Sequence, residues 1–358
     1  GKDPLEIRKL NLYKKGRDTT PYHQTVEQHI LIDMIAQLEE SGDYWARKEA
    51  IKAFNVSSPI IKKGLAMTPV KYGISFTVQH LNQAGALVHV YSDGSIHLNH
   101  GGTEMGQGLN TKIAQIVAHG FGVDFNAVSI SATRTDKVPN TSPTAASSGT
   151  DLNGMAALNA VNTIKERLID FITEHFEVDS QSITFKDNLI TFSKGEISFS
   201  ELANLAYMNR ISLSSTGYYA TPKIHYDRAK GEGRPFFYYA HGVALSEVEV
   251  DTLTGENTVT RVDILHDVGS SINPALDIGQ IEGAFVQGMG WLTTEDLQWN
   301  DKGQLASFGP ANYKIPAIGD TPAEFNVNLY NSANPETTVF RSKAVGEPPF
   351  MLAFSVWS

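Results

Sequence analysis

Residues 86–100 read A-L-V-H-V-Y-S-D-G-S-I-H-L-N-H and carry the strongest β signal in the chain. Apolar and polar side chains alternate on both sides of Asp93-Gly94, which is the pattern of a hairpin closed by a tight turn. Outward from this hairpin, periodicity predicts two more strand pairs and three longer helices: strands at 183–192 and 236–265, helices at about 110–121, 152–175 and 275–291. Antiparallel hairpins among packed helices predict an α+β fold with mixed sheets, not a doubly wound sheet.

The N-terminal part of the chain is helical in pattern. Thr25 followed by Gln28 resembles a capping box, and apolar residues then recur at helical spacing up to Leu38. A second helix is expected after Gly42, and further along Ser200 is expected to cap a short helix. We therefore divide the chain into a helical entry segment, 1–62, and an α+β region, 63–358.

Composition limits the classes of function. With 29 basic and 39 acidic residues the net charge is -10, which disfavours nucleic acid or an anionic membrane surface as a partner. No apolar run reaches the length of a membrane span. The absence of cysteine excludes disulfides, thiolate zinc sites, a catalytic cysteine and cysteine-held iron–sulfur clusters in this polypeptide. This composition fits a cytoplasmic protein.

Common catalytic and nucleotide-binding motifs are missing from the sequence. It contains no G-x-x-x-x-G-K-[ST] phosphate loop, no G-x-S-x-G elbow and no H-E-x-x-H helix. His97 and His100 are three residues apart on an expected strand, so they lie on opposite faces. Because nothing completes a ligand set, we assign these histidines a structural role and expect no protein-ligated metal.

Three glycine-rich or small-residue loops stand before or within expected helices: 101–108 (G-G-T-E-M-G-Q-G), 144–150 (T-A-A-S-S-G-T) and 277–288 (D-I-G-Q-I-E-G-A-F-V-Q-G). Glycine allows backbone N–H groups to approach a ligand closely, and a helix N-terminus favours an anion. Each loop taken alone could equally be a tight turn with ordinary capping. Together they indicate a large polar cofactor without identifying it.

Glu347 is the most unusual charged residue, because it lies in the apolar segment S-K-A-V-G-E-P-P-F, 342–350. A residue before proline is pushed toward an extended backbone, and Pro348 and Pro349 suit the first turn of a helix. Glu347 is therefore expected at or just before a helix N-terminus. From these residues alone it could be either a capping carboxylate or a group with a chemical task.

Four groups of stretches resemble one family: K-Y-G-I-S-F-T with L-N-Q-A-G-A-L-V-H-V-Y (71–77, 81–91), G-G-T-E-M-G-Q-G-L-N-T-K (101–112), V-P-N-T-S-P-T-A-A-S (138–147), and G-Q-I-E-G-A-F-V-Q-G with S-K-A-V-G-E-P-P (279–288, 342–349). They are similar to the molybdenum-binding subunit of the xanthine dehydrogenase and aldehyde oxidase family, the molybdenum hydroxylases. The stretches run in family order and span nearly the whole chain. The resemblance implies the second, C-terminal half of the molybdenum-cofactor-binding domain.

The resemblance also implies roles for individual residues. Glu347 matches the family's general base, and Phe76 and Thr77 match the substrate pocket, where a phenyl ring can stack on a flat heterocycle. Without the family match, Phe76 would be taken for a core aromatic. The positions that match cofactor contacts are Gln107, Ala145, Ala146, Ser147, Ser148 and Gln280. No protein residue ligates the metal in this resemblance.

The activity implied is oxidation of hypoxanthine and xanthine to urate in purine catabolism, with water as the oxygen source. The implied cofactor is molybdopterin, with 2Fe-2S clusters and FAD on a partner chain or missing region, in a homo-oligomer. An aldehyde oxidase is the alternative within the family, because the residues that distinguish the two pockets lie upstream of this sequence. A non-catalytic half-domain that serves assembly is the alternative outside it.

The upstream cofactor loops of the family, including G-G-x-F-G, are not in this sequence. We therefore expect the 358-residue chain alone to hold no stoichiometric molybdenum and to be inactive. The missing N-terminal half of the domain would be its first partner, and an apolar surface left exposed would favour self-association.

Overall fold

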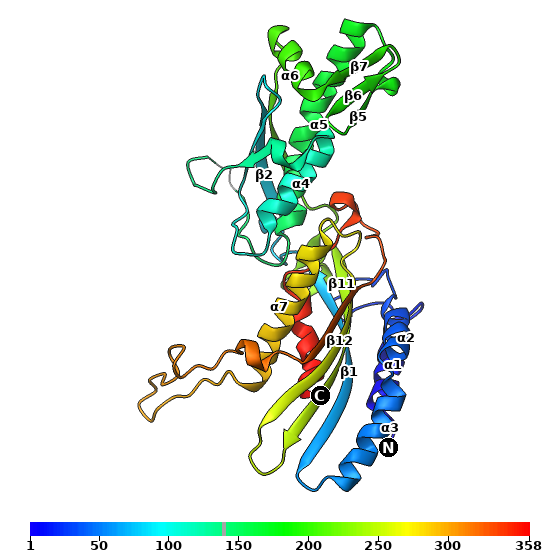
Figure 1. Cartoon of the computed structure of the whole chain (residues 1–358), viewed down its shortest axis with the longest axis vertical. Coiled ribbons are helices and arrows are strands. Elements are labelled where there is room, and N and C mark those ends of the chain that lie inside the picture. Colours follow the sequence, from blue (N-terminus) through cyan, green and yellow to red (C-terminus); the bar gives the residue numbers. More distant parts are fainter. Residues whose placement is uncertain (138–140) are drawn as a thin grey trace. The chain divides into compact units, whose positions relative to one another are not determined.

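Strands β1 (Ile61–Ile74) and β11 (Tyr238–Asp251) pair antiparallel along their whole length, and the chain between them forms a unit of its own. The computed structural model describes residues 1–137 and 141–358 (Figure 1). Unit 1 consists of Gly1–Ile74, Tyr238–Asn334 and Lys343–Ser358, and unit 2 of Ser75–Phe237 and Pro335–Ser342. Residues 138–140, which open one of the family-like stretches, lie outside the described residues. The boundary expected at 62/63 falls inside β1, within unit 1.

The sheet of unit 1 has the order β1-β11-β12-β13. β12 (Asn257–His266) runs antiparallel to β11, as the sequence predicts, and β13 (Glu324–Leu329) adds parallel to β12. Helices lie on both faces of this sheet (Figure 1). One face carries α1 (Pro4–Asn11), α2 (Leu31–Ser41) and α3 (Tyr44–Ser57); the other carries α7 (Pro274–Thr293), the 3-10 helix η6 (Pro348–Ala353) and α8 (Phe354–Trp357). A short 3-10 helix, η4 (Ile318–Asp320), precedes β13.

Strand alternation gives this sheet two apolar faces, so unit 1 has two cores. Met34 and Ile35 of α2 pack with Met67 and Leu245 on one side. On the other side, α7 and η6 pack on the sheet through residues that include Ile281, Phe285, Ile264 and Leu352. The two cores fix α7 and η6 against the strands, and Glu347 directly precedes η6.

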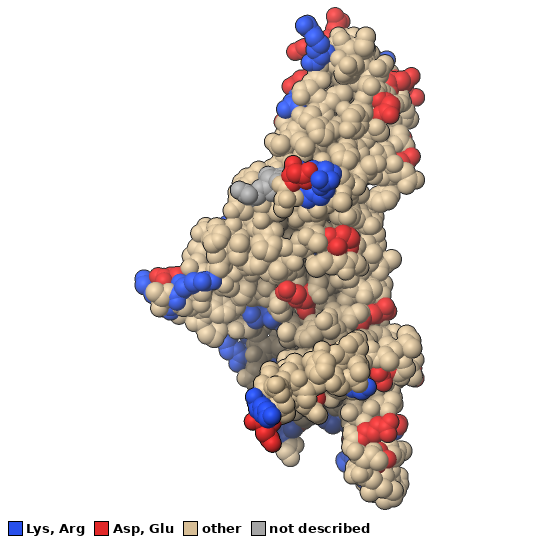
Figure 2. Space-filling model, turned by 90° about the vertical axis from the view of Figure 1, so that its left-hand side faces the viewer, with Lys and Arg blue, Asp and Glu red and all other residues tan. Residues whose placement is uncertain are grey.

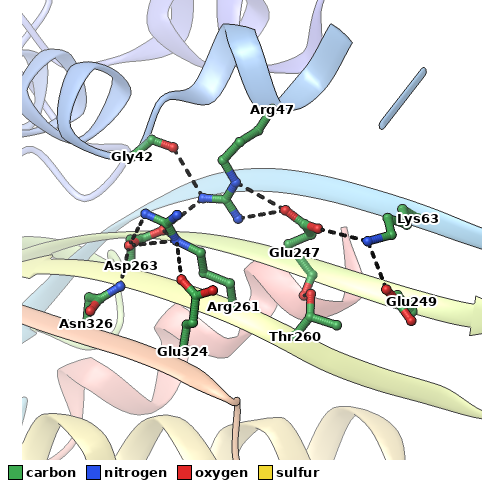
Figure 3. A network of polar contacts seen from close by, with 10 residues as sticks. All are labelled: Gly42, Arg47, Lys63, Glu247, Glu249, Thr260, Arg261, Asp263, Glu324 and Asn326. Carbon is green, nitrogen blue, oxygen red and sulfur yellow. Dashed lines mark hydrogen bonds and ion pairs between the residues drawn. The ribbon is translucent and has the colours of Figure 1, made fainter. Parts of the chain in front are cut away.

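A polar network joins α3 to the sheet (Figure 3). Arg47 donates to Glu247 Oε2 from Nε and Nη2 at 3.1 and 3.0 Å and to Asp263 Oδ2 from Nη1 at 2.9 Å. Asp263 also accepts hydrogen bonds from Arg261 and from Asn326 of β13. Since Asp263 is buried, its charge is stabilised by these partners, and the network pairs charges on elements far apart in sequence.

Unit 2 contains a four-stranded sheet of order β4-β3-β2-β8, covered by two helices. The hairpin predicted at 86–100 is confirmed as β2 (Gln83–Val90) and β3 (Ile96–His100). The other members are β4 (Val128–Ile130), β8 (Ser214–Ala220), α4 (Leu109–Phe121) and α5 (Gly149–Phe176). At Gly217 an added Cβ would lie 2.0 Å from the Ala156 carbonyl oxygen, so glycine allows α5 to approach β8.

The rest of unit 2 is made of short elements. A second sheet joins β5 (Thr184–Lys186), β6 (Leu189–Phe192) and β7 (Gly195–Ser198), and a ribbon joins β9 (His225–Asp227) and β10 (Glu232–Arg234). The remaining helices are α6 (Phe199–Met208) and the 3-10 helices η1 (Gln79–Leu81), η2 (Phe125–Ala127), η3 (Ser180–Ser182) and η5 (Val339–Arg341). The predicted α+β fold class, with mixed sheets and packed helices, is confirmed.

Two predicted helix starts are wrong. Thr25 pairs with Thr19 in an isolated bridge, and α2 begins only at Leu31 without a side-chain cap. The cap of α6 is Ser198 rather than Ser200, because Ser198 and Glu201 have the three-residue spacing that lets each side chain bond to the other's backbone N–H.

Surface charge is distributed in small groups. On the face shown in Figure 2, most Lys and Arg side chains of the described residues lie beside Asp or Glu, with uncharged surface between the groups. Within residues 1–137 and 141–358, no helix is long and apolar enough to span a membrane.

Candidate functional site

Glu347 occupies the N-cap position of η6 and is half-buried. Its backbone, with φ -100° and ψ -36°, is helical, so the extended conformation predicted from the following proline is wrong. The reason is that the Glu347 carbonyl accepts the first hydrogen bond of η6, from Phe350 N at 3.1 Å. Gly288 of α7 allows this turn to approach, since a Cβ there would lie 2.3 Å from the Phe350 carbonyl oxygen.

The carboxylate of Glu347 is held from the sheet rather than used as a cap. Tyr72 of β1 donates its hydroxyl hydrogen bond to Glu347 Oε2 at 2.9 Å, and η6 receives no side-chain cap. Burial, the hydrogen bond to Glu347 and the charge of Glu347 raise the pKa of Tyr72 to about 12. Tyr72 is therefore a neutral hydrogen-bond donor at ordinary pH.

A buried ion pair lies four residues before Glu347. The Lys343 ammonium donates to the Asp267 carboxylate and, at 2.6 Å, to Gln28 Oε1, and neither ionic side chain is exposed. Burial alone would raise the pKa of Asp267, but contacts from His241 and Lys343 outweigh it and lower that pKa to about 2. The ion pair fixes the start of the segment that carries Glu347.

The glycine-rich loop 101–108 of unit 2 is folded around Glu104. Glu104 Oε1 accepts from the backbone N–H groups of Gly106 and Gly108 at 2.9 and 3.0 Å, and Oε2 accepts from Asn110 N at 2.9 Å. Partial burial raises the pKa of Glu104, but these backbone donors together lower it. The charged side chain thus shapes the loop and the start of α4.

Gln107, at the end of this loop, also bonds to the loop itself. Its Oε1 accepts from Met105 N at 2.5 Å, and its Nε2 donates to the Thr103 carbonyl at 2.8 Å. Gln107 is half-buried. It would therefore meet a cofactor as part of an ordered loop.

The second predicted loop, 144–150, lies beside the first in unit 2, because Thr144 Oγ1 accepts from Thr103 N at 2.8 Å. Ala146 and Ser147 have φ of 53° and 55°, in the left-handed region that costs non-glycine residues energy. Ser148 precedes α5, whose N-terminus has no side-chain cap. Backbone N–H groups at this end of α5 suit an anionic group of a cofactor.

Phe76 and Thr77 follow β1 at the start of unit 2. Asn82 is buried and holds this turn with a paired amide contact, accepting from Phe76 N and donating to the Phe76 carbonyl, both at 2.8 Å. Phe76 is half-buried and Thr77 is exposed. Phe76 is thus positioned through its backbone and is not among the fully buried core aromatics.

Gln280 lies on α7 of unit 1 and is half-buried. A Cβ added at its neighbours Gly279 and Gly283 would meet no described atom within 4 Å. Positions 279 and 283 of α7 are therefore open, while Gln280 between them is half-buried.

The structure thus places the predicted site residues in both units. Unit 1 holds Glu347 and Gln280; unit 2 holds Phe76, Thr77, Gln107, Ala145, Ala146, Ser147 and Ser148. Within unit 2 the two loops 101–108 and 144–150 are in contact. Sequence reasoning did not single out Tyr72, Asn82 or Glu104, although all three lie in the family-like stretches 71–77, 81–91 and 101–112.

The histidines of β3 are not arranged as a metal site. His100 is buried, and its Nδ1 accepts from Gly102 N at 3.1 Å. Burial lowers the pKa of His100, which favours its neutral form. Among the residues that the structure describes, no group of three His, Cys, Asp or Glu side chains could hold a metal ion.

The fold and the paired loops define a cofactor-binding domain: this chain belongs to the molybdopterin cofactor-binding domain family, whose family profile matches residues 37–322. Among curated proteins it is 49% identical over 357 residues to xanthine dehydrogenase/oxidase of Gallus gallus and 46% identical over 360 residues to xanthine dehydrogenase of Dictyostelium discoideum. Each match covers 100% of this chain, which spans 25% of the length of either relative.

Solved structures agree on the fold. Quinoline 2-oxidoreductase from Pseudomonas putida 86 superposes with a TM-score of 0.85 at 23% identity, over 99% of this chain and 46% of that one. Reconstituted CO dehydrogenase from Oligotropha carboxidovorans gives a TM-score of 0.87 at 18% identity, over 99% and 45%. The expected fold, that of the molybdenum hydroxylases, is confirmed.

Proposed function

We propose that this chain is part of a xanthine dehydrogenase that oxidises hypoxanthine and xanthine to urate with water as the oxygen source. The single observation that supports the chemistry is the carboxylate of Glu347, which is held by the neutral Tyr72 instead of capping η6. The names of the most similar curated relatives support the substrate class.

The cofactor in this proposal is molybdopterin, and the residues present fit it. The uncapped start of α5 offers backbone N–H groups to its anionic atoms. Loop 101–108, which contacts loop 144–150, bonds most of its own N–H groups internally and contributes the side chain of Gln107. The groups that would hold it are Gln107, Ala145, Ala146, Ser147, Ser148 and Gln280. When bound, it supplies the two-electron oxidation that no side chain of this chain can perform.

The protein's own part is proton transfer and orientation. In the net reaction a ring C–H and one water give a C–OH, two protons and two electrons. Glu347 accepts the proton of the water-derived oxygen nucleophile as that oxygen attacks the electron-poor ring carbon. Phe76, with its backbone fixed by Asn82, offers a flat face on which the heterocycle stacks, and Thr77 adjoins it.

The electrons leave through groups outside this chain, because a polypeptide without cysteine cannot hold 2Fe-2S clusters by thiolates. We therefore assign these clusters and FAD to other parts of the complete protein. The missing half of the molybdenum domain is the first partner. We also propose a homo-oligomer in the cytoplasm.

The direct test is a substrate and label experiment with the complete protein that contains this chain. Xanthine in H2(18)O should give urate carrying one 18O per turnover, and hypoxanthine should be oxidised at a comparable rate. A benzaldehyde assay under the same conditions is the control. Rapid aldehyde oxidation without purine turnover would replace this proposal with an aldehyde oxidase, and no turnover of either substrate by molybdenum-loaded protein would favour an assembly module.

A further inference from the structure

We propose that Tyr72 is a positioning residue for Glu347: its hydroxyl holds the carboxylate in the orientation from which it takes up the proton. This inference rests on the proposed function, because it assumes that Glu347 is the base. It adds a residue that acts through Glu347.

Both ends of this hydrogen bond are attached to ordered backbone. Tyr72 lies near the end of β1, where it is opposite Ala240 in the uninterrupted β1–β11 register. Glu347 follows the segment fixed by the Lys343–Asp267 ion pair and precedes η6, which packs closely on Gly288. A bond of 2.9 Å between two such supports restricts rotation of the carboxylate plane about the last side-chain torsion.

The chemistry of the donor suits this task. With the pKa of Tyr72 raised to about 12, the phenol neither ionises nor competes for the proton. A cationic donor in the same place would form an ion pair and stabilise the carboxylate much more strongly, as Lys343 does for Asp267. A neutral hydroxyl can orient the carboxylate without forming an ion pair with it.

The competing explanation is that the hydrogen bond only attaches η6 to the sheet. Unit 1 offers a matched control for that possibility. Tyr330 donates to Asp33 Oδ2 at 2.6 Å, and the hydrogen bond and burial likewise raise the pKa of Tyr330 to about 12. This second tyrosine–carboxylate bond is more exposed and involves no residue assigned to the reaction, so Tyr330→Phe removes a bond of the same kind with no expected effect on the chemical step.

The experiment compares Tyr72→Phe, Tyr330→Phe, Glu347→Gln and the double variant Tyr72→Phe/Glu347→Gln in the complete enzyme. For each variant we would measure molybdenum content, thermal midpoint, the dissociation constant for xanthine and the rate of reduction by xanthine in a stopped flow. Tyr72→Phe should slow reduction about tenfold, the usual order for losing a hydrogen bond to a charged group, and leave xanthine affinity within about twofold. The Tyr330→Phe enzyme should be reduced by xanthine at the wild-type rate.

The four variants also separate this inference from the proposed function. In the Glu347→Gln background, Tyr72→Phe should slow the reaction no further, because there is no base left to position. Suppose that Glu347→Gln is nearly inactive while molybdenum-loaded Tyr72→Phe is reduced by xanthine at the wild-type rate. The positioning role of Tyr72 is then wrong, and the assignment of Glu347 as the base is kept. If Glu347→Gln itself keeps full turnover, the proposed function and this inference both fail. A Tyr72→Phe enzyme whose slow rate follows only from lost molybdenum would also contradict the inference.

Discussion

Asp267 and Glu347 are two carboxylates of unit 1 that the fold treats in opposite ways. Asp267 is fully buried, paired with Lys343 and in contact with His241, and its pKa is lowered to about 2. Glu347 is half-buried and accepts a hydrogen bond from a neutral phenol. An ion pair keeps a carboxylate ionised and removes it from proton transfer, whereas a neutral donor only orients it. Under the proposed function, this difference separates a structural carboxylate from the one assigned to proton transfer.

The largest expected effect is on turnover. In the complete enzyme, Glu347→Gln should slow reduction by xanthine by about two to four powers of ten, because the amide cannot accept the proton. Xanthine binding and the thermal midpoint should change little. If stopped-flow reduction stays at the wild-type rate while the melting temperature falls, Glu347 is a structural group like Asp267.

The next effect concerns stability. Lys343→Met removes the cation from a fully buried pair and should destabilise the folded chain by about 3–5 kcal/mol, because Asp267 then keeps an uncompensated charge. Chemical denaturation of the 358-residue chain measures this loss. The double variant Lys343→Met/Asp267→Leu should recover most of it. An equal loss in both variants would show that packing, rather than the unpaired charge, is responsible.

A third effect depends on pH and on a residue adjacent to Asp267. Complete burial lowers the pKa of His266 from 6.5 to about 4, so the unfolded chain binds a proton in this range that the folded chain does not. Stability should therefore decrease as pH falls from 6.5 to 4, by about 3 kcal/mol from this group. Burial lowers the pKa of His241 as well, which adds to the same trend.

His266→Met, which fills similar space without a titrating group, is the variant to compare with the wild type. Its denaturation free energy should vary less between pH 6.5 and 4. Identical pH dependence in both proteins would rule out His266 as the source.

The smallest effect extends the comparison to unit 2, where the neutral amide of Asn82 holds the backbone of Phe76. Asn82→Ala should raise KM for xanthine about tenfold in the complete enzyme and change kcat much less, because Phe76 is assigned to binding. Asn82→Asp retains the acceptor for Phe76 N. Its KM for xanthine should therefore lie between the values of the wild type and of Asn82→Ala. An effect on kcat alone would contradict the assignment of Phe76 as a stacking surface.

Much of the fold could be predicted because its elements are locally encoded. The alternation around Asp93-Gly94 and the helical spacing before Phe121 are properties of a few adjacent residues, and both elements are where the sequence predicts them. The predicted helix starts were wrong where tertiary contacts compete with local capping signals. Gln28, expected in a capping box, instead accepts a hydrogen bond from the buried Lys343.

The site was predictable only in part. Glu347 was noticeable because a charge among prolines and apolar residues is rare. Tyr72 could not be found in this way, since it lies 275 residues from Glu347 and meets it only through the strand pairing of the sheet. Asn82 and Glu104 bond to backbone groups of their own loops. Local sequence does not distinguish such side chains from ordinary exposed polar residues.

The pairing of β1 with β11 has a consequence for biosynthesis. Ile74 is opposite Tyr238, so all of residues 75–237 must leave the ribosome before the first pair at that end can form. At ordinary elongation rates this takes roughly ten to thirty seconds, during which the 75–237 part of unit 2 can begin to fold. Throughout that interval β1 has no strand partner from unit 1, and a 14-residue strand with both edges open is a target for chaperones and for mispairing between nascent chains. Translation speed across the unit 2 coding region therefore sets how long the nascent chain stays in this vulnerable state.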